Sequence, residues 1–341
     1  MFDIQNDKLE QPEAFVMPAY DVQLAEFKSR IIDHLKAIKP ELVEAVEDTL
    51  QNPYELGTII TEGAVKTLRD YIRSENYKAT QMLAYWSKGT NLDAKLADLG
   101  LKRQVIEVGD PNAYPPVEPI MESDEDALQR LMLAPFGLST AGTNLGYRFH
   151  AMTLHERPKI TVEKPEPNVV ILRHEFPTEA HTSKVKDVRL KARLTPEGDK
   201  QGKLDMWVLS RENDRGEASQ GLQDEVKTYI AGRDDIIQET DELYVHSAEI
   251  VEYQHVVTLY ATNTPMGTVD KNKVIESLQQ YANAVHQLKG KVEESMVKFI
   301  GHGFYGVTKV VSNIPAAGVV CDIHQAPYCT NIKVDVVYDS A

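Results

Sequence analysis

The chain has 341 residues, and its 52 acidic against 37 basic side chains give a formal net charge of −15. A charge of this size repels phosphate and anionic lipid, so it argues against nucleic-acid and membrane partners. The hydrophobic fraction of 42% is enough for a buried core, and at roughly 150 residues per domain we expect about two domains.

The cysteine content and the N-terminus predict a cytoplasmic place of assembly. Cys321 and Cys329 are too few for a disulfide framework and fit a reducing compartment. Residues 1–15 lack the basic start and apolar run of a signal peptide. No stretch approaches the roughly 18 apolar residues of a membrane-spanning helix.

The first third of the chain is predicted to be helical after a short arm. Residues 1–20 are polar and aperiodic, which predicts an extended arm that is ordered only when a partner holds it. Apolar residues at helical spacing then predict a helix from Asp21 that ends before Pro40, and a shorter one over 42–50.

The longest predicted helix follows Asn52, which we interpret as its N-cap, with Pro53 at the first helical position. Its apolar pattern runs to Gly89, and about 34 helical residues would span roughly 50 Å, more than a small domain covers. The apolar stripe should therefore be buried between chains; the alternative is two helices that break near 74–76 and pack together. The predicted interface stripe is Leu56, Ile60, Ala64, Leu68, Tyr71, Ile72, Ala79, Met82 and Trp86.

The fold class predicted for the whole chain is α+β, in which an N-terminal long-helix region precedes small mixed domains with antiparallel strands. A proline cluster within 109–122 is the best linker candidate. The predicted parts are an extended arm (1–20), a helical bundle-forming region (21–108), the proline-rich linker (109–122), a central α+β domain (123–236) with a hairpin insertion near 157–184, and a C-terminal α+β domain (237–341).

Local signals place the elements after residue 90. Helices are expected over 92–99, from Ser123, from Ser139-Thr140 to Met152, from Ser219, from Asp270, and over 292–300. Strands are expected over 103–108, 159–162, 168–173, 185–194, 203–209, 243–247, 250–262, 319–323 and 330–337.

Two patterns leave an enzyme open as an alternative, nucleotide-dependent in one case and metal-dependent in the other. Gly301 to Gly306 match G-x-G-x-x-G, but a dinucleotide site needs a preceding strand, and 295–300 resembles a helix end. Cys321, His324 and Cys329 lie close in sequence, yet zinc usually takes four ligands and no fourth stands nearby.

Histidines at four positions in the middle of the chain do not form a metal-binding motif. His150, His155, His174 and His181 lack the H-E-x-x-H spacing. We therefore predict no catalytic residue, no cofactor and no metal.

Several segments, in the same order, resemble the baseplate assembly protein J family of contractile-tailed phages and phage-tail-like bacteriocins. Each segment alone is unspecific, and their order over roughly residues 40–338 makes the resemblance; 157–184 departs from it as an insertion. The segments are Met82–Tyr85, Gly89–Asp93, Leu96-Ala97, Arg130–Pro135, Leu138–Thr143, Tyr147–Ala151, Val185–Val188, Val208–Arg211, Ala248–Val251 and Gln325–Cys329.

The resemblance implies a structural, non-enzymatic wedge protein of a contractile-tail baseplate, a hetero-oligomer in the virion tail that assembles in the host cytoplasm. It implies that two copies form a helical bundle with a smaller wedge protein, and that a lysozyme-like-fold wedge protein docks nearby. The C-terminal parts would pair with neighbouring wedges and close a ring around the central hub. A soluble adaptor that forms no ring is the remaining alternative.

Overall fold

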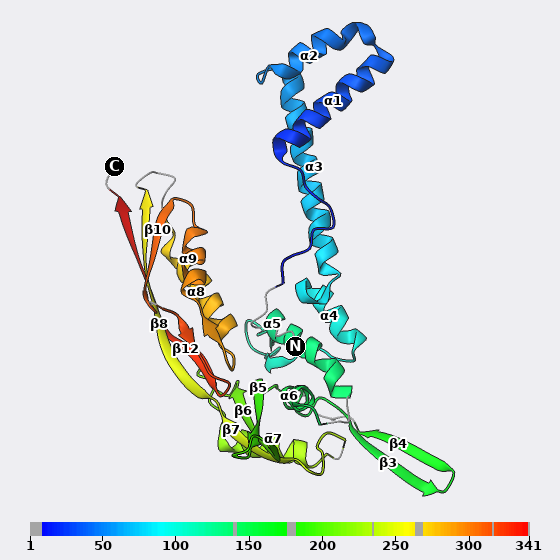
Figure 1. The fold of residues 1–341 in the computed structure, drawn as a ribbon, viewed down its shortest axis with the longest axis vertical. Helices are drawn as coiled ribbons and strands as arrows, with labels where there is room; N and C mark the ends of the chain where they lie inside the picture. Colours follow the sequence, from blue (N-terminus) through cyan, green and yellow to red (C-terminus); the bar gives the residue numbers. More distant parts are fainter. Residues whose placement is uncertain are drawn as a thin grey trace. The chain divides into compact units, whose positions relative to one another are not determined.

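The computed structural model describes residues 9–138, 142–175, 182–233, 235–262, 269–315 and 317–339 (Figure 1). The chain divides into two compact units, Met1–Lys95 and Leu96–Ala341. The first is helical and the second mixes helices with small sheets, which confirms the predicted α+β class. Within the described ranges, no helix combines the length and apolar character needed to cross a membrane.

The first unit is built from three helices that pack on one another. Its elements are α1 (Tyr20–Ile38), a 3-10 turn (Pro40–Leu42), α2 (Val43–Gln51), α3 (Leu56–Gln81), a second 3-10 turn (Ala84–Trp86) and most of α4 (Gly89–Asp98). The hydroxyl of Thr58 donates to the Thr49 carbonyl at 2.7 Å, and this bond fixes the corner between α2 and α3.

Helix α3 is shorter than the sequence predicts, with 26 residues or about 39 Å. It begins after a turn in which the Asn52 side chain accepts the Tyr54 N–H, so Pro53 lies outside the helix. The alternative of a break near 74–76 is wrong, because α3 continues through these residues. It ends where the Gln81 amide donates to the Trp86 carbonyl at 2.9 Å and closes the next turn.

The arm before α1 is bound to α3 of the same chain. Asn76 accepts the Phe15 N–H at 2.8 Å and donates to the Phe15 carbonyl at 2.9 Å, and Arg69 donates to the Pro18 carbonyl at 2.6 Å. The prediction that the arm needs a partner is therefore wrong at Phe15 and Pro18, which its own chain holds, while residues 1–8 lie outside the described ranges.

A central group of elements opens the second unit. Helix α6 begins at Asn144, where the Thr143 hydroxyl accepts the Gly146 N–H; the predicted start at Ser139-Thr140 lies outside the described residues. Strand β6 pairs with β5 antiparallel and with β7 in parallel. The elements are β1 (Val105–Glu107), β2 (Ile120–Met121), α5 (Asp124–Leu133), a 3-10 turn (Ala134–Leu138), α6 (Asn144–Met152), β5 (Val185–Leu194), β6 (Lys200–Ser210), α7 (Gln220–Ala231) and β7 (Glu242–Ser247).

The proline cluster lies in a closed loop between two paired strands. Strands β1 and β2 flank 109–119 and pair antiparallel, and the Val117 N–H donates to the Asp110 carbonyl at 2.9 Å. The division between the two compact units falls earlier, after Lys95.

The predicted insertion contains a two-stranded ribbon. Strands β3 (Lys159–Glu166) and β4 (Val169–Glu175) pair with each other antiparallel, and no other described strand joins them. All of β4 is exposed.

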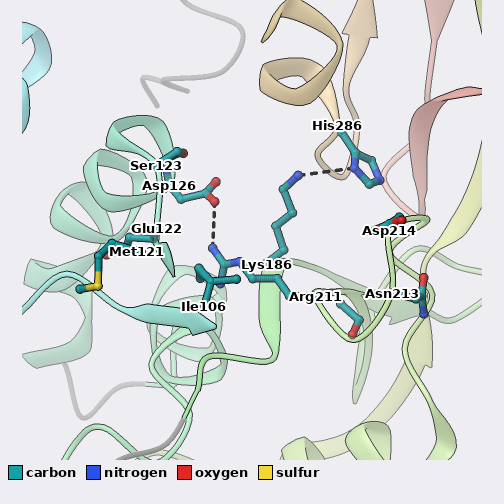
Figure 2. Close-up of a pocket in the computed structure, with 11 residues that line it drawn as sticks. Ile106, Met121, Glu122, Ser123, Asp126, Lys186, Arg211, Asn213, Asp214 and His286 are labelled. Carbon is teal, nitrogen blue, oxygen red and sulfur yellow. Dashed lines mark hydrogen bonds and ion pairs between the residues drawn. The ribbon is translucent and has the colours of Figure 1, made fainter. Parts of the chain in front are cut away.

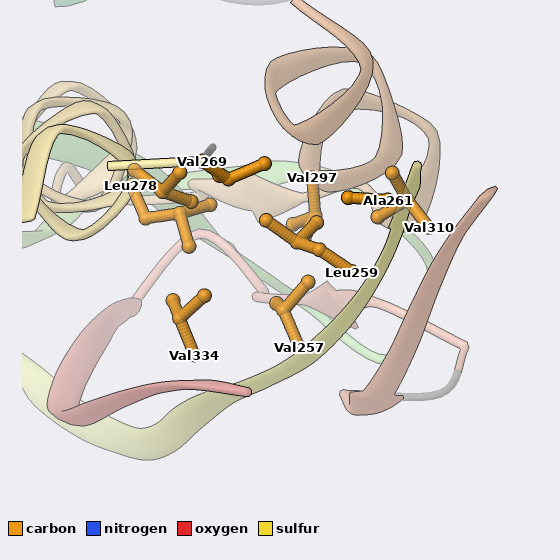
Figure 3. Packing of buried hydrophobic residues seen from close by; sticks show 9 residues of the cluster. Val257, Leu259, Ala261, Val269, Leu278, Val297, Val310 and Val334 are labelled. Carbon is orange, nitrogen blue, oxygen red and sulfur yellow. The ribbon is translucent and has the colours of Figure 1, made fainter. Parts of the chain in front are cut away.

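The C-terminal part of the second unit is a three-stranded sheet covered by helices on one face (Figure 1). Strand β8 (Glu249–Thr262) is central, β10 (Val307–Ile314) pairs with it antiparallel and β12 (Gln325–Asp339) in parallel. Helices α8 (Lys271–Val285) and α9 (Glu294–His302) supply Leu278 and Val297 to the core, which Val257, Leu259 and Val334 meet from the strands (Figure 3).

Two details of this part correct the sequence analysis. The last helix starts at Glu294, because Val292 belongs to β9 (Lys291–Val292), which pairs with β11 (Val319–Val320). The predicted strand over 319–323 is thus only two residues long, and β10 was not predicted.

Three buried histidines lie in the second unit. Burial lowers the pKa of His150, His255 and His286 to about 4, aided by Arg233 beside His150 and by Lys186 beside His286. Neither ring nitrogen of His255 has a hydrogen-bond partner among the described residues. All three side chains are therefore neutral at pH 7.

We expect stability to fall as the pH drops from about 6.5 towards 4. The folded-state pKa lies below the usual histidine value, so the unfolded chain binds more protons in this window, and each buried histidine costs about 2 kcal/mol between pH 7 and pH 5. Urea unfolding at both pH values measures the loss. His255→Phe should reduce it, whereas the exposed control His302→Gln should leave it unchanged; equal losses in both variants would contradict the assignment.

Candidate interface and buried ionic junction

The predicted interface stripe lies largely on the surface of the first unit. Leu56 is 69% exposed, Leu68 40% and Met82 78%. Ile60, Ala64 and Tyr71 are also exposed. The partly buried members are Ile72, Ala79 and Trp86.

The face of α3 that is buried in this chain is a different one. Thr58, Thr61 and Val65 are buried, and both threonine hydroxyls donate to backbone carbonyls. At 3.6 residues per turn this face lies roughly a third of a turn from the apolar stripe. On α3, threonines and a valine therefore pack inside the unit, and the leucine and tyrosine side chains of the stripe are left outside.

An exposed apolar row of this kind is a candidate interface. Single apolar residues on a surface are ordinary, but a contiguous row along one helix marks a surface that another chain covers. Burying one leucine or isoleucine side chain is worth about 1.5–3 kcal/mol, so even part of this row can hold a helix in place.

In the second unit, one carboxylate joins segments from four places in the sequence. Asp187 is completely buried and accepts N–H groups from Gln129 at 2.9 Å and from Arg148 at 2.8 Å. Its oxygens also accept the backbone N–H of Val188 at 2.7 Å and of Leu288 at 3.1 Å. The carboxylate thereby connects α5, α6 and β5 to the loop that follows α8.

A second buried ion pair lies at the start of α5. Both nitrogens Nε and Nη2 of Arg130 donate to the Glu122 carboxylate, and the two side chains are 1% and 0% exposed. Arg130 also donates to the Lys102 carbonyl at 2.6 Å, while the Gln104 N–H donates to Glu122 at 3.0 Å. The pair is fully hydrogen-bonded, as a buried ion pair must be to offset its desolvation.

Four of the ten segments that carried the family resemblance contribute a residue to buried ion pairs. Arg130, Arg148 and Asp187 each come from one of them, and Arg211 from a fourth. Arg211 donates to Asp126 at 2.8 Å and to the Val185 carbonyl at 2.7 Å. These roles were not predicted from the sequence; the available signal was a carboxylate at position 187 between the apolar residues Val185 and Val188, which are also buried.

A small pocket of about 230 Å³ lies beside this junction (Figure 2). Lys186 extends across it, and its Nζ lies 3.4 Å from Nδ1 of His286. Burial lowers the pKa of Lys186, with Arg211 adding to the effect. The Arg211–Asp126 ion pair forms another wall of the pocket.

The glycine-rich motif is a helix end. Gly303 caps α9, and Gly306, with φ of 82°, turns the chain into β10. A helix therefore precedes the motif and a strand follows it, the reverse of a dinucleotide-binding turn. A Cβ on Gly301 would lie 2.8 Å from Val310, so this glycine lets α9 approach the sheet.

Of the residues considered as zinc ligands, Cys321 and His324 lie in the loop between β11 and β12, and Cys329 lies on β12. Cys321 is buried with a pKa raised to about 11 by burial, and His324 pairs with Glu249 at 3.4 Å. In the part of the chain that the structure describes, no three His, Cys, Asp or Glu side chains are placed to hold a metal ion.

The four histidines have separate environments as well. His150 is buried, His155 pairs with Glu225 at 3.0 Å, and His174 lies on the exposed strand β4. His181 is outside the described residues.

These features define a mixed α+β protein whose helical unit presents an apolar face and whose second unit is joined by buried ion pairs. The chain is similar to baseplate protein J of Escherichia phage P2, with 28% identity over 340 residues that cover 97% of each protein. This similarity confirms the resemblance to the baseplate protein J family. No family model matches the chain.

Removing the Asp187 carboxylate should destabilise the second unit. Asp187→Ala leaves Arg148 buried without its counter-charge, and losses of this kind are about 3–5 kcal/mol. Guanidinium unfolding measures the change. The matched control is Asp199→Ala at the exposed turn between β5 and β6, for which we expect a change within about 0.5 kcal/mol; equal effects of the two substitutions would refute the role of Asp187.

Proposed function

We propose that this chain is a structural subunit of a phage tail baseplate. The similarity to baseplate protein J extends over nearly the whole of both proteins, which supports a role in the same kind of assembly. The single observation that carries the proposal further is the exposure of the stripe residues on α3, which we call the α3 stripe: Leu56, Ile60, Ala64, Leu68 and Tyr71. A row of apolar side chains of this kind is typical of a surface that another chain covers.

In the assembly we propose, the α3 stripe packs against a second copy of the chain and a smaller wedge protein in a helical bundle. A lysozyme-like-fold wedge protein docks nearby. The C-terminal α+β domain pairs with neighbouring wedges in a ring around the central hub. The wedge forms in the host cytoplasm and remains in the contractile virion tail without any enzymatic role.

A single charge in the stripe tests the bundle. Leu68→Asp places a carboxylate where the proposed bundle has an apolar core, and we expect co-purification with the smaller wedge protein to fall at least tenfold. Leu68 is already 40% exposed in the chain itself, so the second unit should unfold at the wild-type denaturant concentration.

The matched control is Lys66→Asp, an exposed position almost opposite Leu68 on the helix. It should leave co-purification unchanged. Wild-type recovery of the partner with Leu68→Asp would refute the bundle, and a small complex that never grows beyond one partner in light scattering would favour the adaptor alternative.

A further inference from the structure

The C-terminal sheet has one long edge that no described strand covers. Strand β12 spans 15 residues and pairs only with β8. In a parallel pair the backbone groups of an edge strand point alternately to its neighbour and away from it. The outer row of N–H and C=O groups on β12 is therefore available to another strand.

This edge differs from the opposite edge of the sheet. Strand β10 has register irregularities near both ends, which twist an edge away from pairing. Strand β12 has one irregularity, between Cys329 and Asn331, and is regular beyond it. Neither proline nor glycine occurs from 328 to 339, so every residue of this stretch keeps a backbone N–H that can join a ladder.

The two faces of β12 have distinct roles. Val334 is buried in the core, and Ile332 and Val336 pack beside it. On the other face Lys333 and Asp335 have side chains that are 61% and 49% exposed and form an ion pair at 3.2 Å. The order Lys333, Val334, Asp335 places opposite charges symmetrically about one apolar residue.

This order is complementary to itself when two strands run antiparallel. With Val334 opposite Val334 of a second copy, each Lys333 faces an Asp335 across the interface, and opposite charges in directly facing positions stabilise a sheet. A two-fold axis generates the same contact twice. A parallel pairing in register would instead place like charges together.

We propose that β12 is a homotypic docking edge, which pairs antiparallel with β12 of a second copy about Val334. The two three-stranded sheets then form one continuous six-stranded sheet. This inference deepens the proposed function, because it names the surface through which the C-terminal domains of neighbouring wedges pair.

Cysteine cross-linking tests both the partner and the register. In the proposed register Asn331 of one copy faces Val337 of the other, with Cβ atoms about 5 Å apart, close enough for a disulfide. In a full-length Cys329→Ser background, mild oxidation of the variant with Asn331→Cys and Val337→Cys should give a covalent dimer as the main band on a non-reducing gel. Within one strand the same two positions are roughly 20 Å apart and cannot link.

Each single variant, Asn331→Cys or Val337→Cys, is the matched control and should give no covalent dimer on the non-reducing gel, because in the proposed register no second cysteine faces it. Absence of dimer from the double variant would overturn the proposal, and so would equal dimer yields from the single variants.

Charge reversal gives an independent test by sedimentation. Lys333→Asp should weaken self-association several-fold, because two like-charge pairs then face each other, and adding Asp335→Lys should restore it. Arg173→Glu, which breaks an exposed ion pair with Glu163 on the β3–β4 ribbon, is the control and should have no effect. The cross-link between positions 331 and 337 and the effect of charge reversal could both be absent while Leu68→Asp still prevents co-purification. In that case the proposed baseplate role stands, and only the proposed docking through β12 is refuted.

Discussion

The fold of the second unit depends on the burial of one charge, the carboxylate of Asp187. Removing such a charge from water costs several kcal/mol unless it is paired and hydrogen-bonded. Here two side chains and two backbone N–H groups supply that compensation, and they come from segments as distant as Gln129 and Leu288. The carboxylate is therefore satisfied only when all of these segments are in place.

The first unit follows the opposite rule. Its longest helix buries threonines and leaves leucine, isoleucine and tyrosine at the surface. The hydroxyls of Thr58 and Thr61 lose nothing by burial, because each donates to a carbonyl of the same corner or the same helix. The apolar area that would normally stabilise a small helical unit is thus available for contacts between chains, which is the physical basis of the proposed assembly.

Much of the fold could be predicted because its signals are local. Strand β5 has the predicted bounds, and Ser123, Ser219 and Asp270 cap the helices they were expected to begin. The features that were not predicted depend on contacts between residues that are distant in the sequence. Strand β10 exists because it pairs with β8, some 50 residues earlier, and the role of Asp187 depends on partners from four segments. Exposure of the α3 stripe fits the sequence analysis, while its covering by partner chains stays a prediction.

Polar bonds also hold the central and C-terminal parts of the second unit together. Their shared apolar cluster is small, since Leu209, Ala248, Leu288 and Ala326 are its buried members, whereas the C-terminal core contains nine buried residues. Apolar contacts are non-directional, so a cluster of this size permits several orientations of the two parts. The bonds from the Leu288 N–H to Asp187, from the Ala248 N–H to the Val208 carbonyl and between His286 and the Arg215 carbonyl are directional, and together they restrict the orientation. The orientation is thus set by polar geometry, while most of the apolar burial stabilises each part separately.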